Sequence, residues 1–121
     1  MKILLADPDE YYHTQLVERL GHLGEFVVTT EAQEARRILS QTPPDFLITE
    51  LLLADSSGYE ILEDVQKVAV EKRFPVIVFS KIDNLEDIET ALNLGVNAYF
   101  VKGKDDIQEI HKLILAYNNA R

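Results

Sequence analysis

The stretch that decides the fold is PDFLITELLLADSSGYEIL, residues 44–62. A short apolar run, residues 46–49, stops at the carboxylate of Glu50, and a helical pattern of apolar residues begins near Gly58. An apolar run followed by a polar turn and a helix is typical of a strand buried on both faces in a parallel sheet. A carboxylate at the end of such a strand lies where folds of this kind bind their ligands.

The same alternation of a short apolar run and a helical stripe occurs five times along the chain. The runs cover residues 2–6, 26–29, 46–49, 76–79 and 98–101. The stripes that follow them are Tyr12, Leu16, Val17 and Leu20; Ala32, Ala35, Ile38 and Leu39; Ile61, Leu62, Val65, Val68 and Ala69; Ile88, Ala91 and Leu92; and Ile107, Ile110, Leu113, Ile114 and Tyr117. Five strand–helix units with short links predict a single α/β domain over residues 1–121, with a doubly wound, mostly parallel sheet between two layers of helices.

Length and composition exclude several classes of protein. The 121 residues are 46% hydrophobic, which is enough for one core. The formal charge of -9 disfavours direct binding to nucleic acid. The absence of cysteine excludes disulfides and thiolate sites. Because the sequence has neither the core of a signal peptide nor a membrane span, we expect a cytoplasmic domain that does not bind membranes.

The residues directly after the apolar runs are the candidates for a functional site, because parallel strands present their carboxyl ends to one crevice. They are Asp7, Thr30, Glu50, Ser80 and Lys102. Two carboxylates, a hydroxyl and an ammonium suit a divalent cation and a phosphoryl group. Carboxylates are ligands that Mg²⁺ prefers, and hydroxyl and ammonium groups donate hydrogen bonds to phosphate oxygens.

With these motifs the chain resembles the receiver domains of two-component response regulators over essentially its whole length. The resemblance rests on KILLADPDE (2–10), the stretch 44–62, PVIVFSK (75–81) and GVNAYFVKGK (95–104). It implies a flavodoxin-like sheet of strand order 2-1-3-4-5 with five helices on two faces. It also implies an acidic pair that holds Mg²⁺ after the first strand and a phospho-accepting aspartate after the third. A Ser or Thr is expected after the fourth strand, and a switch aromatic and a lysine on the fifth.

The site residues depart from this family pattern. Glu50 replaces the phospho-accepting aspartate, Pro8 replaces the second acid of the pair, and Gly103 replaces the proline that usually follows the lysine. Glutamate is one methylene longer, and a displacement of about 1 Å can cost on the order of a hundredfold in rate. Only Asp7 and Asp9 remain to face a metal beside Glu50, so we expect Mg²⁺ binding at Asp7 and Glu50 to be weak or absent.

The remaining site residues have a predicted partner or switch role. We predict a salt bridge between Lys102 and Glu50, with Lys81 as the substitute partner, because a carboxylate is rarely buried unpaired. The longer Glu50 also brings a permanent negative charge toward the phosphate position. The resemblance implies that Ser80 and Tyr99 act as the switch pair.

Structural interpretations stay open beside these roles. Asp7 can be the N-cap of the first helix, with Pro8 at its first position and Glu10 completing a capping box. Ser80 can cap a turn, and Gly58 can supply a flexible loop. The histidines, which are scattered in the sequence and are interpreted as surface residues rather than metal ligands, are His13, His22 and His111.

We therefore predict a non-enzymatic receiver-like module that needs no cofactor and acts by binding proteins without aspartyl phosphorylation. The resemblance implies a docking surface on the fourth helix, fifth strand and fifth helix, for a kinase, an output domain, another signalling protein or a second copy. Its predicted contributors are Leu85, Leu94, Tyr99 and Leu115. The alternatives are a receiver that keeps Mg²⁺-dependent phosphorylation, an engineered Asp-to-Glu phosphomimetic variant, and a nucleotide-binding domain of the same topology. The absence of a glycine-rich phosphate-binding motif disfavours the last one.

Overall fold

A parallel sheet forms the centre of the computed structural model, which describes residues 1–120. Its strands are β1 (Lys2–Ala6), β2 (Glu25–Thr29), β3 (Phe46–Thr49), β4 (Val76–Ser80) and β5 (Ala98–Val101). They lie in the order β2-β1-β3-β4-β5, and every neighbouring pair is parallel. The predicted doubly wound α/β fold and its strand order are confirmed.

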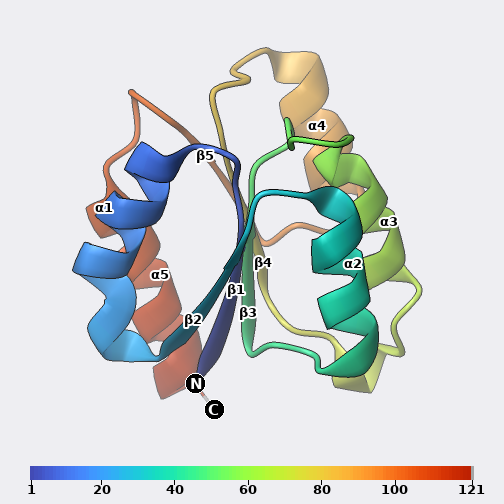
Figure 1. Cartoon of the computed structure of the whole chain (residues 1–121), viewed down its shortest axis with the longest axis horizontal. Coiled ribbons are helices and arrows are strands. Elements are labelled where there is room, and N and C mark those ends of the chain that lie inside the picture. Colours follow the sequence, from blue (N-terminus) through green and yellow to red (C-terminus); the bar gives the residue numbers. More distant parts are fainter. Residues whose placement is uncertain (121) are drawn as a thin grey trace.

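The helices cover both faces of this sheet. They are α1 (Glu10–Leu20), α2 (Ala32–Gln41), α3 (Gly58–Gln66), α4 (Leu85–Asn93) and α5 (Ile107–Asn119), with short 3-10 helices η1 (Gly21–Leu23) and η2 (Val70–Lys72). Helices α1 and α5 lie side by side on one face, and α2, α3 and α4 cover the other (Figure 1). No helix within residues 1–120 has the length and apolar character needed to cross a membrane.

The sheet divides the hydrophobic core into two clusters. Successive side chains of a strand point to opposite faces, so Ile3 and Leu5 pack under α1 and α5, whereas Leu4 and Ala6 pack under α2 and α3. All four side chains are fully buried. Burial on both faces explains why the strands are continuous apolar runs rather than alternating ones.

The third helix is shorter than predicted. It ends at Gln66, so Val68 and Ala69, which we expected to extend its apolar face, lie beyond it. Lys67 is the C-cap, and the Val68 N–H bonds to the carbonyl of Val65 in a tighter turn. Val68 is half-buried, so an apolar residue just past the helix end still adds to its apolar pattern, whereas Ala69 is exposed.

Candidate functional site

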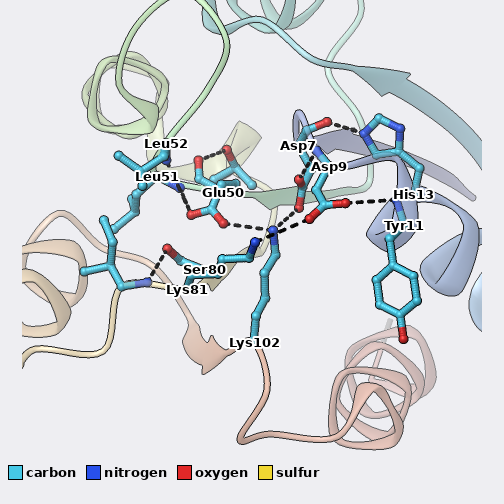
Figure 2. Close-up of polar contacts among 12 residues, drawn as sticks. Asp7, Asp9, Tyr11, His13, Glu50, Leu51, Leu52, Ser80, Lys81 and Lys102 are labelled. Carbon is cyan, nitrogen blue, oxygen red and sulfur yellow. Dashed lines mark hydrogen bonds and ion pairs between the residues drawn. The ribbon is translucent and has the colours of Figure 1, made fainter.

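The carboxyl ends of β1, β3 and β5 bring Asp7, Glu50 and Lys102 into direct contact. The Lys102 Nζ lies 2.6 Å from Asp7 Oδ2 and 2.8 Å from Glu50 Oε2 (Figure 2). The exposed fractions of Asp7, Glu50 and Lys102 are 1%, 3% and 7%. The predicted ion pair between Lys102 and Glu50 is confirmed, and the equally close pair between Lys102 and Asp7 is an addition to it. We call these three residues the ion cluster.

Main-chain hydrogen bonds of the sheet fix the positions of the ion cluster. The N–H of Glu50 donates to the carbonyl of Ala6, the residue before Asp7, at 2.8 Å. The N–H of Lys102 donates to the carbonyl of Ser80 at 2.9 Å. The parallel ladder therefore continues one step beyond the strands, and it sets the spacing between the charged residues.

The Glu50 carboxylate is folded back onto its own loop. Its Oε1 accepts hydrogen bonds from the N–H groups of Leu51 at 2.7 Å and Leu52 at 3.4 Å, while Oε2 contacts Lys102 (Figure 2). Both oxygens are thus bound by donors, and the side chain is buried. The extra methylene allows this turn, and the negative charge that we expected at the phosphate position is paired with the Lys102 ammonium.

The ammonium of Lys102 lies in a mixed aromatic and anionic environment. Its Nζ is 4.4 Å from the ring centroid of Tyr12 and 5.8 Å from that of Phe79. Burial alone would lower the pKa of Lys102, but the hydrogen bonds to Asp7 and Glu50 outweigh it, so its pKa is raised. Burial raises the pKa of Asp7, and the hydrogen bond from Lys102 offsets only part of that effect. Lys102 is therefore charged throughout the physiological pH range.

Asp9, not Asp7, is the N-cap of α1. Asp9 Oδ1 accepts a hydrogen bond from the N–H of Tyr11 at 2.9 Å. Asp7 accepts from the N–H of Asp9 at 2.8 Å instead, so the prediction that Asp7 caps the helix is wrong. Pro8 is exposed between the two acids. The Lys81 Nζ lies 3.6 Å from Asp9 Oδ2. Its side chain is exposed at the edge of the site, so Lys81 pairs with Asp9 and is not a partner of Glu50.

Ser80 and Tyr99 bind the same loop residue beside the ion cluster. The Oγ of the fully buried Ser80 accepts a hydrogen bond from the N–H of Ile82 at 3.0 Å, which confirms that Ser80 caps a turn. The Tyr99 hydroxyl donates to the carbonyl of Ile82 at 2.7 Å. Burial raises the pKa of Tyr99, so its hydroxyl is a neutral donor. Both residues hold the loop before α4, and their switch role stays a prediction.

Gly58 is a close-contact residue rather than a flexible one. A Cβ at this position would lie 2.3 Å from the carbonyl oxygen of Glu50. The Gly58 N–H also donates to the carbonyl of Leu51 at 2.8 Å, so the start of α3 is bonded to the loop of the ion cluster. The interpretation of Gly58 as a source of loop flexibility is wrong, since glycine is needed for backbone approach.

We expect Gly58→Ala to lower the free energy of unfolding by about 1–3 kcal/mol, because the added methyl group forces two backbone segments apart. Urea unfolding followed by circular dichroism measures the change. Gly21→Ala is the matched control, since its Cβ would meet its nearest neighbour, Val17 Cγ1, at 3.8 Å. The control should change stability by less than about 0.5 kcal/mol. Equal losses in the two variants would contradict the close-contact role.

Gly103 has a backbone conformation that the usual proline cannot adopt. Its φ is 85°, in the region that favours glycine. Proline fixes φ near about −65°, so the chain after Lys102 follows a path that a proline would prevent. The departure from the family pattern at this position is therefore a change of backbone as well as of side chain.

Two of the three histidine positions are closer in space than their scatter in the sequence suggests. The rings of His22 and His111 are in contact, with centroids 5.2 Å apart. His13 Nε2 hydrogen-bonds with the carbonyl oxygen of Asp7 beside the ion cluster (Figure 2). The spacing of residues in the sequence does not predict either contact. The first joins η1 to α5, and the second joins α1 to the loop that precedes it.

The ion cluster does not fit a resident Mg²⁺ ion. Asp7 and Glu50, the two predicted ligands, both contact the Lys102 ammonium, and Asp9 caps a helix. Within residues 1–120, no group of three or more His, Cys, Asp or Glu side chains is arranged to hold a metal ion. Since Mg²⁺ requires a near-octahedral shell of oxygens, it would have to displace the ammonium to bind here.

Comparison with known proteins gives one consistent match. The sequence model of the response regulator receiver domain matches residues 3–115. The chain is 29% identical over 102 residues to a probable transcriptional regulator, ycf27, of Guillardia theta, and 25% identical over 116 residues to the Regulator of RpoS of Escherichia coli K12. These alignments cover 84% and 95% of this chain but only 39% and 34% of the two regulators. The chain thus spans well under half of the length of either relative.

A solved structure supports the same fold. The BeF3-activated N-terminal receiver domain of RstA from Klebsiella pneumoniae superimposes with a TM-score of 0.82 at 20% sequence identity. The superposition covers 95% of this chain and 97% of that domain. At this identity, the similarity concerns the arrangement of strands and helices.

Proposed function

Because this chain belongs to the family of response regulator receiver domains, we propose that it is a phosphorylation-independent receiver that acts as a protein-interaction module in two-component signalling. The observation that carries the proposal is the Lys102 ammonium bound between two buried carboxylates. In this proposal the module is not an enzyme, functions in the cytoplasm and needs no metal. In place of phosphorylation, the proposed signal is whether the binding surface is present and accessible to a partner.

The ion cluster opposes phosphorylation in two ways. An acceptor carboxylate must offer a free oxygen to phosphorus, and both oxygens of Glu50 are already bound, by Lys102 and by the N–H groups of Leu51 and Leu52. The site also has its own fixed cation. A Mg²⁺ ion would have to compete with an ammonium held at 2.6 and 2.8 Å by two carboxylates. These contacts support a site whose charge is changed neither by phosphorylation nor by Mg²⁺ binding.

For the binding surface we propose the face formed by α4, β5 and α5. Helix α4 exposes Leu85 and Leu92 by 69% and 46%, which supports a protein contact there. Tyr99 on β5 donates a hydrogen bond to Ile82 in the loop before α4, so this face is linked to the rim of the ion cluster. A kinase, an output domain, another signalling protein or a second copy of the chain would bind through it, with Leu94 and Leu115 as further contacts.

Intact-mass spectrometry after incubation with Mg²⁺ and acetyl phosphate tests the proposal. We expect no mass gain of one phosphate, because the acceptor oxygens are bound and the Lys102 ammonium competes with Mg²⁺ for the two carboxylates. A phospho-accepting receiver domain treated in parallel shows that the donor is active. A stoichiometric gain in this chain that disappears in Glu50→Gln would overturn the proposal.

The second candidate function is a receiver that retains Mg²⁺-dependent phosphorylation. It is favoured by Asp7, Ser80 and Lys102, which stand at the family's site positions around Glu50. Among the described residues, Lys102 is the one cation that forms ion pairs with Asp7 and Glu50, so the cluster of two carboxylates and one ammonium keeps a net negative charge that attracts metal. The same mass measurement separates the two candidates.

A further inference from the structure

His22 and His111 form a contact at the end of α1 opposite to the ion cluster. His22 lies on η1, which follows α1, and His111 lies on α5, which packs beside α1 (Figure 1). Their ring centroids are 5.2 Å apart, and the rings are inclined by 66°. The His22 side chain is exposed and that of His111 is half-buried. The pair is therefore reached from solvent through His22.

The two nitrogens of the His111 ring have different surroundings. Nδ1 lies 3.3 Å from the side-chain amide nitrogen of Gln108, one turn earlier on α5. Nε2 is buried and has no hydrogen-bond partner among residues 1–120. Buried polar atoms almost always have a partner, so an unpartnered ring nitrogen requires an explanation. An imidazole with one nitrogen held and the other free is the usual state of a metal-binding histidine.

The spacing of the two rings is compatible with a shared metal ion. A zinc–nitrogen bond of about 2.1 Å places the centre of an imidazole ring roughly 3.2 Å from the metal. Two such rings at the tetrahedral angle have centroids about 5.2 Å apart, whereas two at a right angle are separated by about 4.5 Å. The observed separation of 5.2 Å, which is also that of an ordinary edge contact between rings, is compatible with the tetrahedral arrangement.

We propose that His22 and His111 bind Zn²⁺, with water completing a tetrahedral shell. Binding through Nε2 of His111 leaves the proton on Nδ1, and Nδ1–H then donates a hydrogen bond to the side-chain oxygen of Gln108 once the amide oxygen and nitrogen exchange places. The net charge of -9 raises the local concentration of cations at the surface. The bound ion would join η1 to α5. This site is independent of the ion cluster, because its ligands are imidazoles and Mg²⁺ prefers oxygen.

Isothermal titration calorimetry of the untagged chain with zinc chloride tests the site. We expect one equivalent of Zn²⁺ to bind, and His22→Ala and His111→Ala each to weaken the affinity at least tenfold. His13→Ala is the matched control for loss of an imidazole, and it should bind Zn²⁺ as the unchanged chain does. Because His22 is exposed, its replacement leaves the core intact, so it remains informative if His111→Ala does not fold.

Three outcomes would overturn the proposal. They are an absence of zinc binding by the unchanged chain, an affinity that His22→Ala leaves the same, and a loss of binding in Asp7→Asn, which would place the ion at the ion cluster instead. In each case the unchanged chain would show no zinc-induced shifts of the His22 and His111 ring signals in nuclear magnetic resonance spectra. Retained shifts in His13→Ala would support the site.

Discussion

Replacing Lys102 by methionine should lower the free energy of unfolding by roughly 3 kcal/mol or more, because it leaves two buried carboxylates without their cation. Methionine keeps an unbranched side chain of similar length, so the loss of charge is the main change. Asp7 and Glu50 contact the ammonium at 2.6 and 2.8 Å, and both are buried. Urea unfolding at pH 7, followed by circular dichroism, measures the loss.

Lys81→Met is the control for a lysine outside the ion cluster. Its side chain is 66% exposed and lies 3.6 Å from Asp9, so its removal should cost about 1 kcal/mol or less. Similar losses in the two variants would show that burial of the ion cluster contributes nothing. The comparison separates a buried pair from an exposed one within the same crevice.

The loss in Lys102→Met should shrink as the pH falls from 7 toward 4. Burial raises the pKa of Asp7 above its ordinary 3.8, and Lys102 opposes that rise, so the pKa goes up further without Lys102. An acid whose pKa is raised by folding adds stability below its unfolded pKa, and this stability is lost as the pH rises through the folded pKa. The variant therefore regains stability on acidification. A difference that widens toward pH 4 would contradict this assignment.

The strands could be predicted from the sequence because they are buried on both faces. The predicted bounds of β1, β3 and β5 agree with the structure. Strand β2 begins one residue earlier, at Glu25, and β4 ends one residue later, at Ser80. These two polar residues still make ladder hydrogen bonds, and hydrophobicity does not report on main-chain bonding.

The strand-end rule identified the ion cluster, but the local roles within it required coordinates. Asp7 and Asp9 are both good capping residues, and only the backbone path decides that Asp9 caps α1. The wall that Tyr12 and Phe79 form around the ammonium depends on packing between elements, as does the contact of Gly58 with Glu50. Neither spacing nor composition records such distances.

The double substitution of Pro8→Asp and Glu50→Asp should convert the ion cluster into a site that binds Mg²⁺ and accepts a phosphoryl group. Two carboxylates and one ammonium now leave a single net negative charge. A third carboxylate beside Asp7 brings the charge to two, which matches a divalent cation. Shortening Glu50 by one methylene also moves its carboxylate away from the Lys102 ammonium and frees an oxygen.

We expect the chain to tolerate both changes. Pro8 is exposed and precedes the N-cap Asp9, so an aspartate there removes no residue from α1. At position 50 the main-chain N–H keeps its bond to the carbonyl of Ala6, because that bond does not involve the side chain. The variant should therefore keep the fold while the charge and reach of its site change.

Calorimetry with magnesium chloride and intact-mass spectrometry with acetyl phosphate measure the conversion. Each single variant should bind Mg²⁺ weakly, since Pro8→Asp keeps the long Glu50 and Glu50→Asp keeps the broken acidic pair. The double variant should gain more than the sum of the two, as expected for residues that share one ligand. Pro8→Asn with Glu50→Asp is the matched control, with the same shapes and no carboxylate added at position 8, and it should gain no more than Glu50→Asp alone. If the unchanged chain takes up Mg²⁺ and phosphate as readily as the double variant, neither Pro8 nor Glu50 is the barrier, and the ammonium yields its place to the metal.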